Sequence, residues 1–176
     1  MSWTHTYLHN SMTEMDALLN IINEAFPVSP QPPRFFLLEH EASLDLDIPR
    51  ELKERIAGRS WTHVTLLDWR MIGASPMVAR RYLEPATFLY YVPSIIVGAF
   101  QETAFIDFAL EAIIPDNKTR IPRGEWWHKF SAAITLPQRA ALSASLSYIR
   151  LTLWDSIGLA NQSLLEHAET IWNSRD

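Results

Sequence analysis

Residues 85–101 read PATFLYYVPSIIVGAFQ, a run without a single charged side chain. A membrane-spanning helix needs about twenty apolar residues. This run is shorter, contains Pro93 and includes the flexible Gly98. We therefore interpret it as a buried helical segment of a globular core rather than as a membrane span. Pro85 is expected to open a helix, and Pro93 is expected to break or kink it so that a second helix begins there.

Apolar residues on both sides of this run recur at spacings of three and four, which is the period of an α-helix. The segments with this pattern are 15–26, 52–56, 61–71, 105–114, 142–153 and 164–172. Alternation with period two is almost absent, so we predict an all-α fold, with room for a short strand near 34–38. The prediction is one compact domain over residues 1–176 with about six to eight helices.

Capping residues and prolines predict where the helices begin and end. Ser11 and Glu14 fit a capping box, so the first helix is expected to begin near Ser11, after a frayed terminus at 1–10. The proline-rich stretch 27–33 is expected to be an extended connector, and 115–124 an exposed loop. Further expected boundaries are helix entry at 47–49, termination at Gly58, a cap at Ser60, termination at 73–76, helix opening at Pro137, and a last helix from Asn161 or Ser163.

The composition excludes several kinds of chemistry. The chain has 176 residues, 48% of them hydrophobic, and no cysteine. It can therefore bury a sizeable core, but it has no thiolate nucleophile, no disulfide and no zinc site built on sulfur. The first residues show neither a basic stretch nor an apolar run, so we expect no signal peptide and a cytoplasmic protein.

The net charge of −5 is unevenly distributed. Residues 1–47 carry seven acidic residues and one basic residue, 48–154 carry nine acidic and thirteen basic, and 155–176 carry four acidic and one basic. The two acidic ends could pair with the mildly basic middle, or they could form separate faces of the fold.

Few residues suggest catalysis or metal binding. The pair His5 and His9 has helical ligand spacing, but it precedes the first predicted cap and lacks a nearby glutamate. The group 39–41, Glu-His-Glu, would place its carboxylates opposite the imidazole in an extended segment. We also find no nucleophile elbow, phosphate-binding glycine loop or dinucleotide motif, and we predict no cofactor, no metal and no catalytic residue.

Two stretches mix basic and aromatic residues, as nucleic-acid-binding surfaces do. They are 80–82, Arg-Arg-Tyr, and 118–129. The isoelectric point near 5.7 argues against a nucleic-acid partner.

Trp126 and Trp127 are adjacent, and neighbours on a helix point about 100° apart. Because one helix face cannot bury both rings, we expect one of them to be an exposed anchor. Aromatic residues and arginine are enriched at protein interfaces, and this chain has twelve arginines against three lysines.

The segment 82–93, YLEPATFLYYVP, preceded by WTHV at 61–64, resembles a bacterial domain family of unknown function. In that family a tryptophan helix precedes a segment of the FL-P-F-YYLP type. Phe130 and LPQRAAL at 136–142 resemble its closing helix, so the resemblance spans roughly residues 20–150. Glu84 stands before Pro85 rather than after it, and the second motif lacks the usual Thr-Pro-Glu start. The shared motifs are hydrophobic and architectural, so the resemblance implies no catalytic residue.

We predict a non-enzymatic protein-binding domain, of the immunity type that binds and neutralises a cognate bacterial toxin. The predicted partner-binding residues are Glu39, Glu41, Asp45, Asp47, Glu51, Trp126 and Trp127. One alternative is an enzyme whose site is assembled from distant residues, with His40, Glu41, Arg80 and His128 as candidates. Another is a homodimeric structural module built on the helix at 90–100. No membrane partner is expected.

Overall fold

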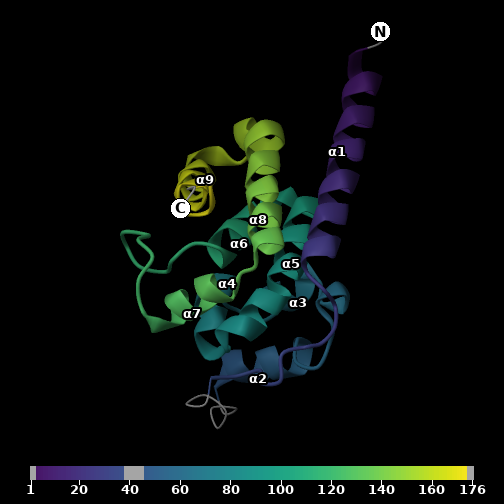
Figure 1. The fold of residues 1–176 in the computed structure, drawn as a ribbon. Coiled ribbons are helices and arrows are strands. Elements are labelled where there is room, and N and C mark those ends of the chain that lie inside the picture. The colour runs from purple at the N-terminus through teal and green to yellow at the C-terminus, as the bar shows by residue number, and fades with distance from the viewer. Residues whose placement is uncertain (1–2, 38–45, 174–176) are drawn as a thin grey trace.

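The structure, a computed structural model, describes residues 3–37 and 46–173, and the side chains of the first helix from Glu14 onward (Figure 1). Its helices are α1 (Trp3–Ala25), α2 (Asp47–Arg55), α3 (Leu66–Arg70), α4 (Pro76–Ala79), α5 (Pro85–Gln101), α6 (Ile106–Ala112), α7 (Glu125–Ala133), α8 (Leu136–Tyr148) and α9 (Gly158–Trp172). The described residues contain no strand, so the prediction of an all-α fold is confirmed. The short strand allowed near 34–38 is reduced to one antiparallel bridge between Phe36 and Leu83.

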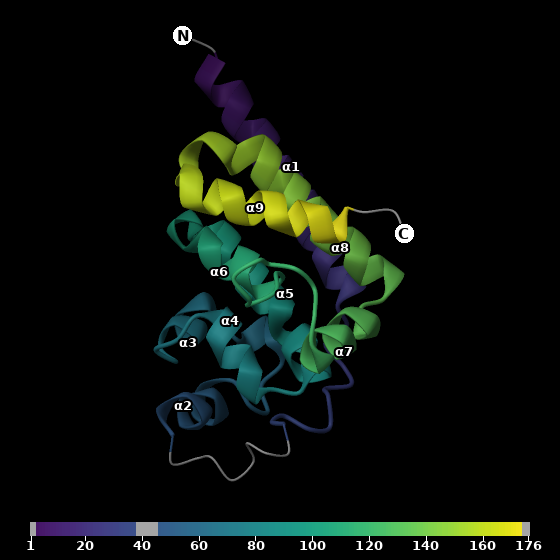
Figure 2. The same ribbon diagram turned by 90° about the vertical axis from the view of Figure 1, so that its left-hand side faces the viewer.

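α5 and α6 form the middle of the molecule (Figures 1 and 2). α1, α8 and α9 pack on one side, with α1 against α8 and α9 against α6, and α2, α3 and α4 lie on the other side. α7 packs against α5. The uncharged run of the sequence is therefore the central helix of the core. Among the described helices, none is both long and apolar enough to cross a bilayer.

α5 runs without interruption through Pro93, so the predicted break at this residue is wrong. An internal proline removes a backbone hydrogen bond and costs about 3 kcal/mol. Here neighbours surround the helix, and Val92, Pro93 and Ser94 are all buried. The Ser94 hydroxyl donates to the Tyr91 carbonyl and accepts from Trp69 Nε1 at 2.9 Å. Packing on every side therefore outweighs the local cost.

Burial of α5 also rules out one alternative function. From Tyr90 to Phe100 every residue except Val97 is buried inside the single chain. A homodimer built on this segment would need an exposed apolar face that the monomer does not have.

Several predicted boundaries are shifted. α1 begins at Trp3 rather than near Ser11, so residues 3–10 are helical rather than frayed. The segment after Ser60 is not one helix: a 3₁₀ turn at Trp61–His63 is followed by α3, whose capping box uses Thr65 and Asp68. α9 begins at Gly158, earlier than expected.

Other boundaries agree with the sequence. The connector at 27–33 and the loop at 115–124 are free of helix, and Gly58 follows α2 with the left-handed φ of 75°. α8 begins beside Pro137 as predicted, with Thr135 and Gln138 forming its capping box. Beyond Tyr148 the chain continues as a π-helical turn, Ile149–Leu153, before α9.

Candidate functional site

The structure describes four of the seven predicted partner-binding residues, namely Asp47, Glu51, Trp126 and Trp127. Glu39, Glu41 and Asp45 lie outside the described residues, as does His40. Asp47 and Glu51 lie on α2, and both form ion pairs within that helix. Asp47 Oδ1 is 2.6 Å from Arg50 Nη2, and Glu51 Oε2 is 2.5 Å from Arg55 Nε. The two described carboxylates of this set are therefore already neutralised locally.

Neither tryptophan of the adjacent pair is an exposed anchor, so that expectation is wrong. Trp127 is 4% exposed, and its ring lies 5.4 Å from the Phe130 ring and 6.1 Å from the Trp172 ring. Trp126 is half-buried, stacks on Phe130 at 5.2 Å and donates from Nε1 to the Leu83 carbonyl at 2.9 Å. α7 has core on two sides, so two directions 100° apart can both be buried.

Arg80 was a candidate for catalysis and for nucleic-acid binding, but it is only 2% exposed. Its guanidinium donates to the backbone carbonyls of Glu111, Ala112 and Ile114 at 3.2, 3.1 and 2.8 Å. It also faces the Trp126 ring, whose centroid is 5.2 Å away. Burial lowers the pKa of Arg80 to about 10, so the group stays charged at neutral pH. Arg80 joins the C-terminal end of α6 to α4 and the 3₁₀ turn at Arg80–Tyr82.

The remaining titratable candidates are dispersed. His63, His128 and His167 are exposed. Asp107 and Glu111 lie four residues apart on α6, and each has one buried oxygen without a hydrogen-bond partner. Among the described side chains, those of residues 14–37 and 46–173, no three histidine or acidic groups lie close enough to hold a metal ion together.

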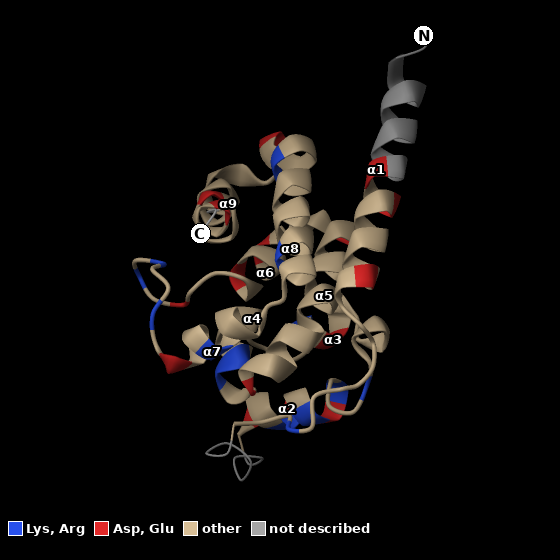
Figure 3. Cartoon of the chain, viewed as in Figure 1, with Lys and Arg blue, Asp and Glu red and all other residues tan. Residues whose placement is uncertain are grey.

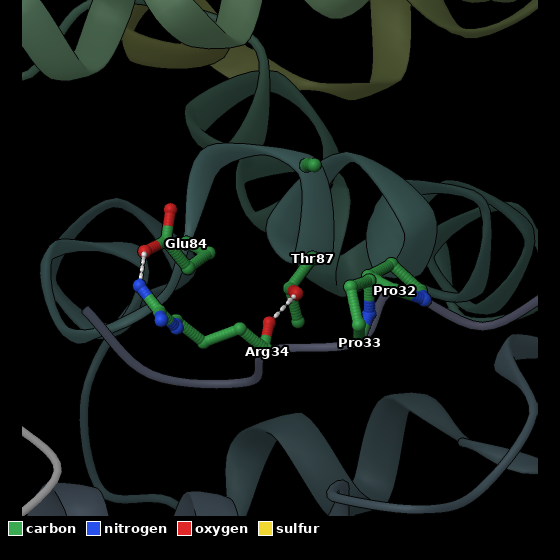
Figure 4. A pocket seen from close by; sticks show the side chains of 6 residues that line it. Pro32, Pro33, Arg34, Glu84 and Thr87 are labelled. Atoms are coloured by element: carbon green, nitrogen blue, oxygen red, sulfur yellow. Dashed lines mark hydrogen bonds and ion pairs between the residues drawn. The ribbon is translucent and has the colours of Figure 1, made fainter. Parts of the chain in front are cut away.

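A pocket of about 380 Å³ lies between the proline-rich connector and the first turn of α5 (Figure 4). Pro32, Pro33, Arg34, Glu84, Ala86 and Thr87 line it. Two polar contacts cross it: Arg34 Nη1 lies 3.7 Å from Glu84 Oε1, and Thr87 Oγ1 donates to the Arg34 carbonyl at 2.5 Å. These contacts tie the connector to α5, and we assign the pocket a structural role.

The charge segregation of the sequence has two different outcomes in the fold. At the C-terminal end, Glu169 pairs with Arg150 of the basic middle, with oxygens 3.0 and 2.5 Å from the guanidinium nitrogens. At the N-terminal end, the exposed carboxylates of α1, Glu14, Asp16 and Glu24, form no ion pair within the described part of the chain. The acidic N-terminal segment therefore provides a separate face (Figure 3).

We call the side of α1 that carries Glu14, Ile21 and Glu24 the acidic α1 face; Asp16 lies about 160° around the helix from Glu14 and is not part of it. Glu14, Ile21 and Glu24 are seven and three residues apart, which places them on one side of a helix. Ile21 is 43% exposed between the two glutamates. The chain has no lysine or arginine before Arg34, so α1 has no permanently charged cation of its own to pair with these carboxylates.

The comparisons with known proteins add no relative. No protein-family model, no curated protein and no solved structure matches this chain. The resemblance of 61–64, 82–93 and 130–142 to a bacterial domain family therefore stays a prediction, and function has to be argued from the surface itself.

Proposed function

We propose that this chain is a non-enzymatic protein-binding domain that docks a basic surface of a partner protein on the acidic α1 face. The observation that carries the proposal is the set of exposed carboxylates on α1 that lack an ion pair within the described residues. Elsewhere in the described fold, Asp47, Glu51 and Glu169 are paired with arginine, and the exposed carboxylates without an ion pair, Glu54, Asp155 and Glu166, lie on three different elements. None of the partner-binding residues predicted from the sequence lies on α1, so the proposed face differs from the predicted one.

The face has the chemistry of an electrostatic docking surface. Complementary charge accelerates association and selects partners, while an apolar residue at the centre adds buried area. Ile21 supplies such a centre, and the glutamates flank it along the helix. The body of the molecule holds α1 through its other side, because Leu18 and Ile22 are buried and α1 packs against α8. The exposed side is therefore presented on a fixed support.

We further propose that the domain is of the immunity type, with a toxin as its partner. What supports this is the combination of small size, net acidity, absence of cysteine and aromatic richness. An inhibitor of this type has to be complementary to a specific surface, and it needs no catalytic group of its own. A basic substrate-binding or nucleic-acid-binding surface on the toxin would match the acidic α1 face.

The test is calorimetric titration of the purified chain with the product of the adjacent gene. Glu14→Lys/Glu24→Lys is expected to weaken binding about tenfold or more, mainly through a lower association rate. The matched control is Glu54→Lys/Asp155→Lys, which changes the net charge equally at exposed positions on α2 and before α9. It is expected to bind within about twofold of the original chain.

Two results would contradict the proposal. If the unaltered chain forms no complex with the neighbouring gene product, the toxin-inhibitor version is wrong. If the α1 variant and the control variant lose affinity to the same extent, the acidic α1 face is not the docking surface.

A further inference from the structure

The loop at 115–124 is fixed in shape by its own side chains. Asn117 Nδ2 donates to the Ile121 carbonyl at 2.8 Å, while Asn117 Oδ1 accepts from the Ile121 backbone N–H at 3.3 Å. Thr119 Oγ1 donates to the same Asn117 oxygen at 2.8 Å. The Asn117 side chain thus binds both backbone groups of Ile121 and closes the turn from 117 to 121.

Arg120 fixes the loop to the body of the protein. It has a φ of 54°, a left-handed conformation that residues other than glycine rarely adopt. Its Nη1 lies 3.2 Å from the Pro115 carbonyl and 3.1 Å from Met77 Sδ. Binding through this loop would therefore cost little ordering entropy, because the turn is already held in place.

The loop carries an exposed apolar residue between basic ones. Ile121 is 57% exposed, and Lys118 and Arg123 are exposed on either side of it in sequence. The one acidic residue of the loop, Asp116, is paired with Arg81 Nε at 2.8 Å. We call the surface formed by Lys118, Ile121 and Arg123 the basic loop.

The basic loop is the charge counterpart of the acidic α1 face. One surface has Ile121 flanked by Lys118 and Arg123, and the other has Ile21 flanked by Glu14 and Glu24. Figures 1 to 3 place α1 and the loop on opposite sides of the molecule, so they cannot meet within one chain. Two copies can bring them together.

We propose that the basic loop of one copy docks on the acidic α1 face of a second copy. A contact between two different surfaces is head-to-tail, so it extends into longer assemblies unless the rotation between copies closes a ring. The same α1 face serves the proposed partner, so self-association and partner binding exclude each other on any one copy. The self-association itself requires no partner and does not depend on the proposed function.

The contact is expected to be weak. Exposed ion pairs add only a few-fold each to an equilibrium constant, and one apolar pair adds a similar amount. We expect a dissociation constant on the order of 0.1–1 mM at low salt. Raising the salt from about 50 mM to about 500 mM shortens the screening length roughly threefold and should weaken the association about fivefold or more.

The test is sedimentation equilibrium of the full chain from about 20 µM to about 1 mM. The unaltered chain should show a weight-average mass that rises with concentration at low salt and much less at high salt. Lys118→Glu/Arg123→Glu, which makes both surfaces acidic, should stay monomeric. Glu14→Lys/Glu24→Lys, which makes both surfaces basic, should also stay monomeric. The Glu54→Lys/Asp155→Lys control should associate as the unaltered chain does.

An equimolar mixture of the two reversed variants is the decisive measurement. In the mixture, the unaltered acidic α1 face of one variant meets the unaltered basic loop of the other, and the two reversed surfaces are also opposite in charge. The mixture should therefore associate although neither variant does alone. Both variants carry a net negative charge, so general charge attraction would not produce this result. The proposal is overturned if the unaltered chain is monomeric at about 1 mM and low salt, if either reversed variant still associates, or if the mixture does not. Far-UV circular dichroism of each variant verifies that the helices are intact.

Discussion

Replacing Arg80 should cost a large share of the stability of this protein. The guanidinium is 2% exposed and donates to three backbone carbonyls near the C-terminal end of α6. Arg80→Met keeps most of the side-chain volume but removes every donor. A buried acceptor left without a donor costs about 1–3 kcal/mol. Part of this loss is offset because a buried charge no longer has to be desolvated.

We therefore expect Arg80→Met to lower the free energy of unfolding by about 3–5 kcal/mol. A domain of this kind is stable by about 5–15 kcal/mol, so the variant should remain folded at low temperature. Arg80→Lys keeps the charge but cannot reproduce the planar fork, and it should cost about 1–3 kcal/mol. The measurement is urea unfolding followed by far-UV circular dichroism, with the slope of the transition checked for constancy.

Besides lowering the free energy of unfolding, the loss of Arg80 should change the fluorescence of nearby tryptophans. The Arg80 guanidinium lies 5.2 Å from the Trp126 ring and 5.5 Å from the Trp127 ring. Its removal should change the tryptophan fluorescence of the folded state before any unfolding occurs. A loss below about 1 kcal/mol for Arg80→Met would refute the reasoning, because it would mean that the three carbonyls do not depend on Arg80.

Two further predictions concern α5. Gly98→Ala should destabilise the fold by about 1–3 kcal/mol in chemical unfolding, because a Cβ at this position would lie 2.7 Å from Leu66 Cβ and close to its backbone. An unobstructed helical glycine would instead gain stability on replacement by alanine, so a gain would contradict this close approach. Burial raises the pKa of Tyr91 to about 12 from 10.0, and its hydroxyl donates to the Ile56 and Arg59 carbonyls. The folded state therefore holds this proton more tightly, and the stability that Tyr91 contributes is complete below pH 10 and is lost as the pH rises towards 12. The stability difference between the unaltered chain and Tyr91→Phe, measured in urea at a series of pH values, should shrink across that window, and a constant difference would show that Tyr91 does not titrate as its burial implies.

The sequence predicted the helices well where local signals and tertiary packing agree. Apolar periodicity located the long helices, and Pro137 located the start of α8. The predicted break at Pro93 shows the limit of local signals. A proline lowers local helix stability by a known amount, but the sequence does not reveal that other helices pack around α5 and keep it helical through Pro93.

The helix predicted over residues 61–71 is divided into two elements for a similar reason. Ser60 and Thr65 are both good capping residues, and apolar spacing alone could not choose between them. In the structure the Thr65 hydroxyl and the Asp68 carboxylate satisfy each other's backbone N–H groups, while the Ser60 side chain forms no cap. A second capping box, Thr65 with Asp68, was present in the sequence and could have indicated the later start.

Burial of Arg80 could not have been predicted from its neighbours. Arg80 and Arg81 are identical in type and adjacent, yet Arg81 is exposed and pairs with Asp116. The difference comes from a distant segment, the end of α6. Its three backbone carbonyls accept hydrogen bonds from Arg80 and not from Arg81. The same applies to Trp126 and Trp127, whose burial depends on α5 and α9 lying on two sides of α7.

The charge pattern was informative because the order of residues along a helix decides which charges can pair within it. An ion pair within a helix needs both signs three or four residues apart. α2 has both, and its Asp47 and Glu51 are paired, whereas α1 has carboxylates but no lysine or arginine. Any neutralisation of α1 must therefore come from another element or another molecule. No other described element forms an ion pair with these carboxylates. The acidic α1 face can therefore still pair with a basic surface of another molecule. The basic loop of a second copy and the basic surface of a different protein would compete for it.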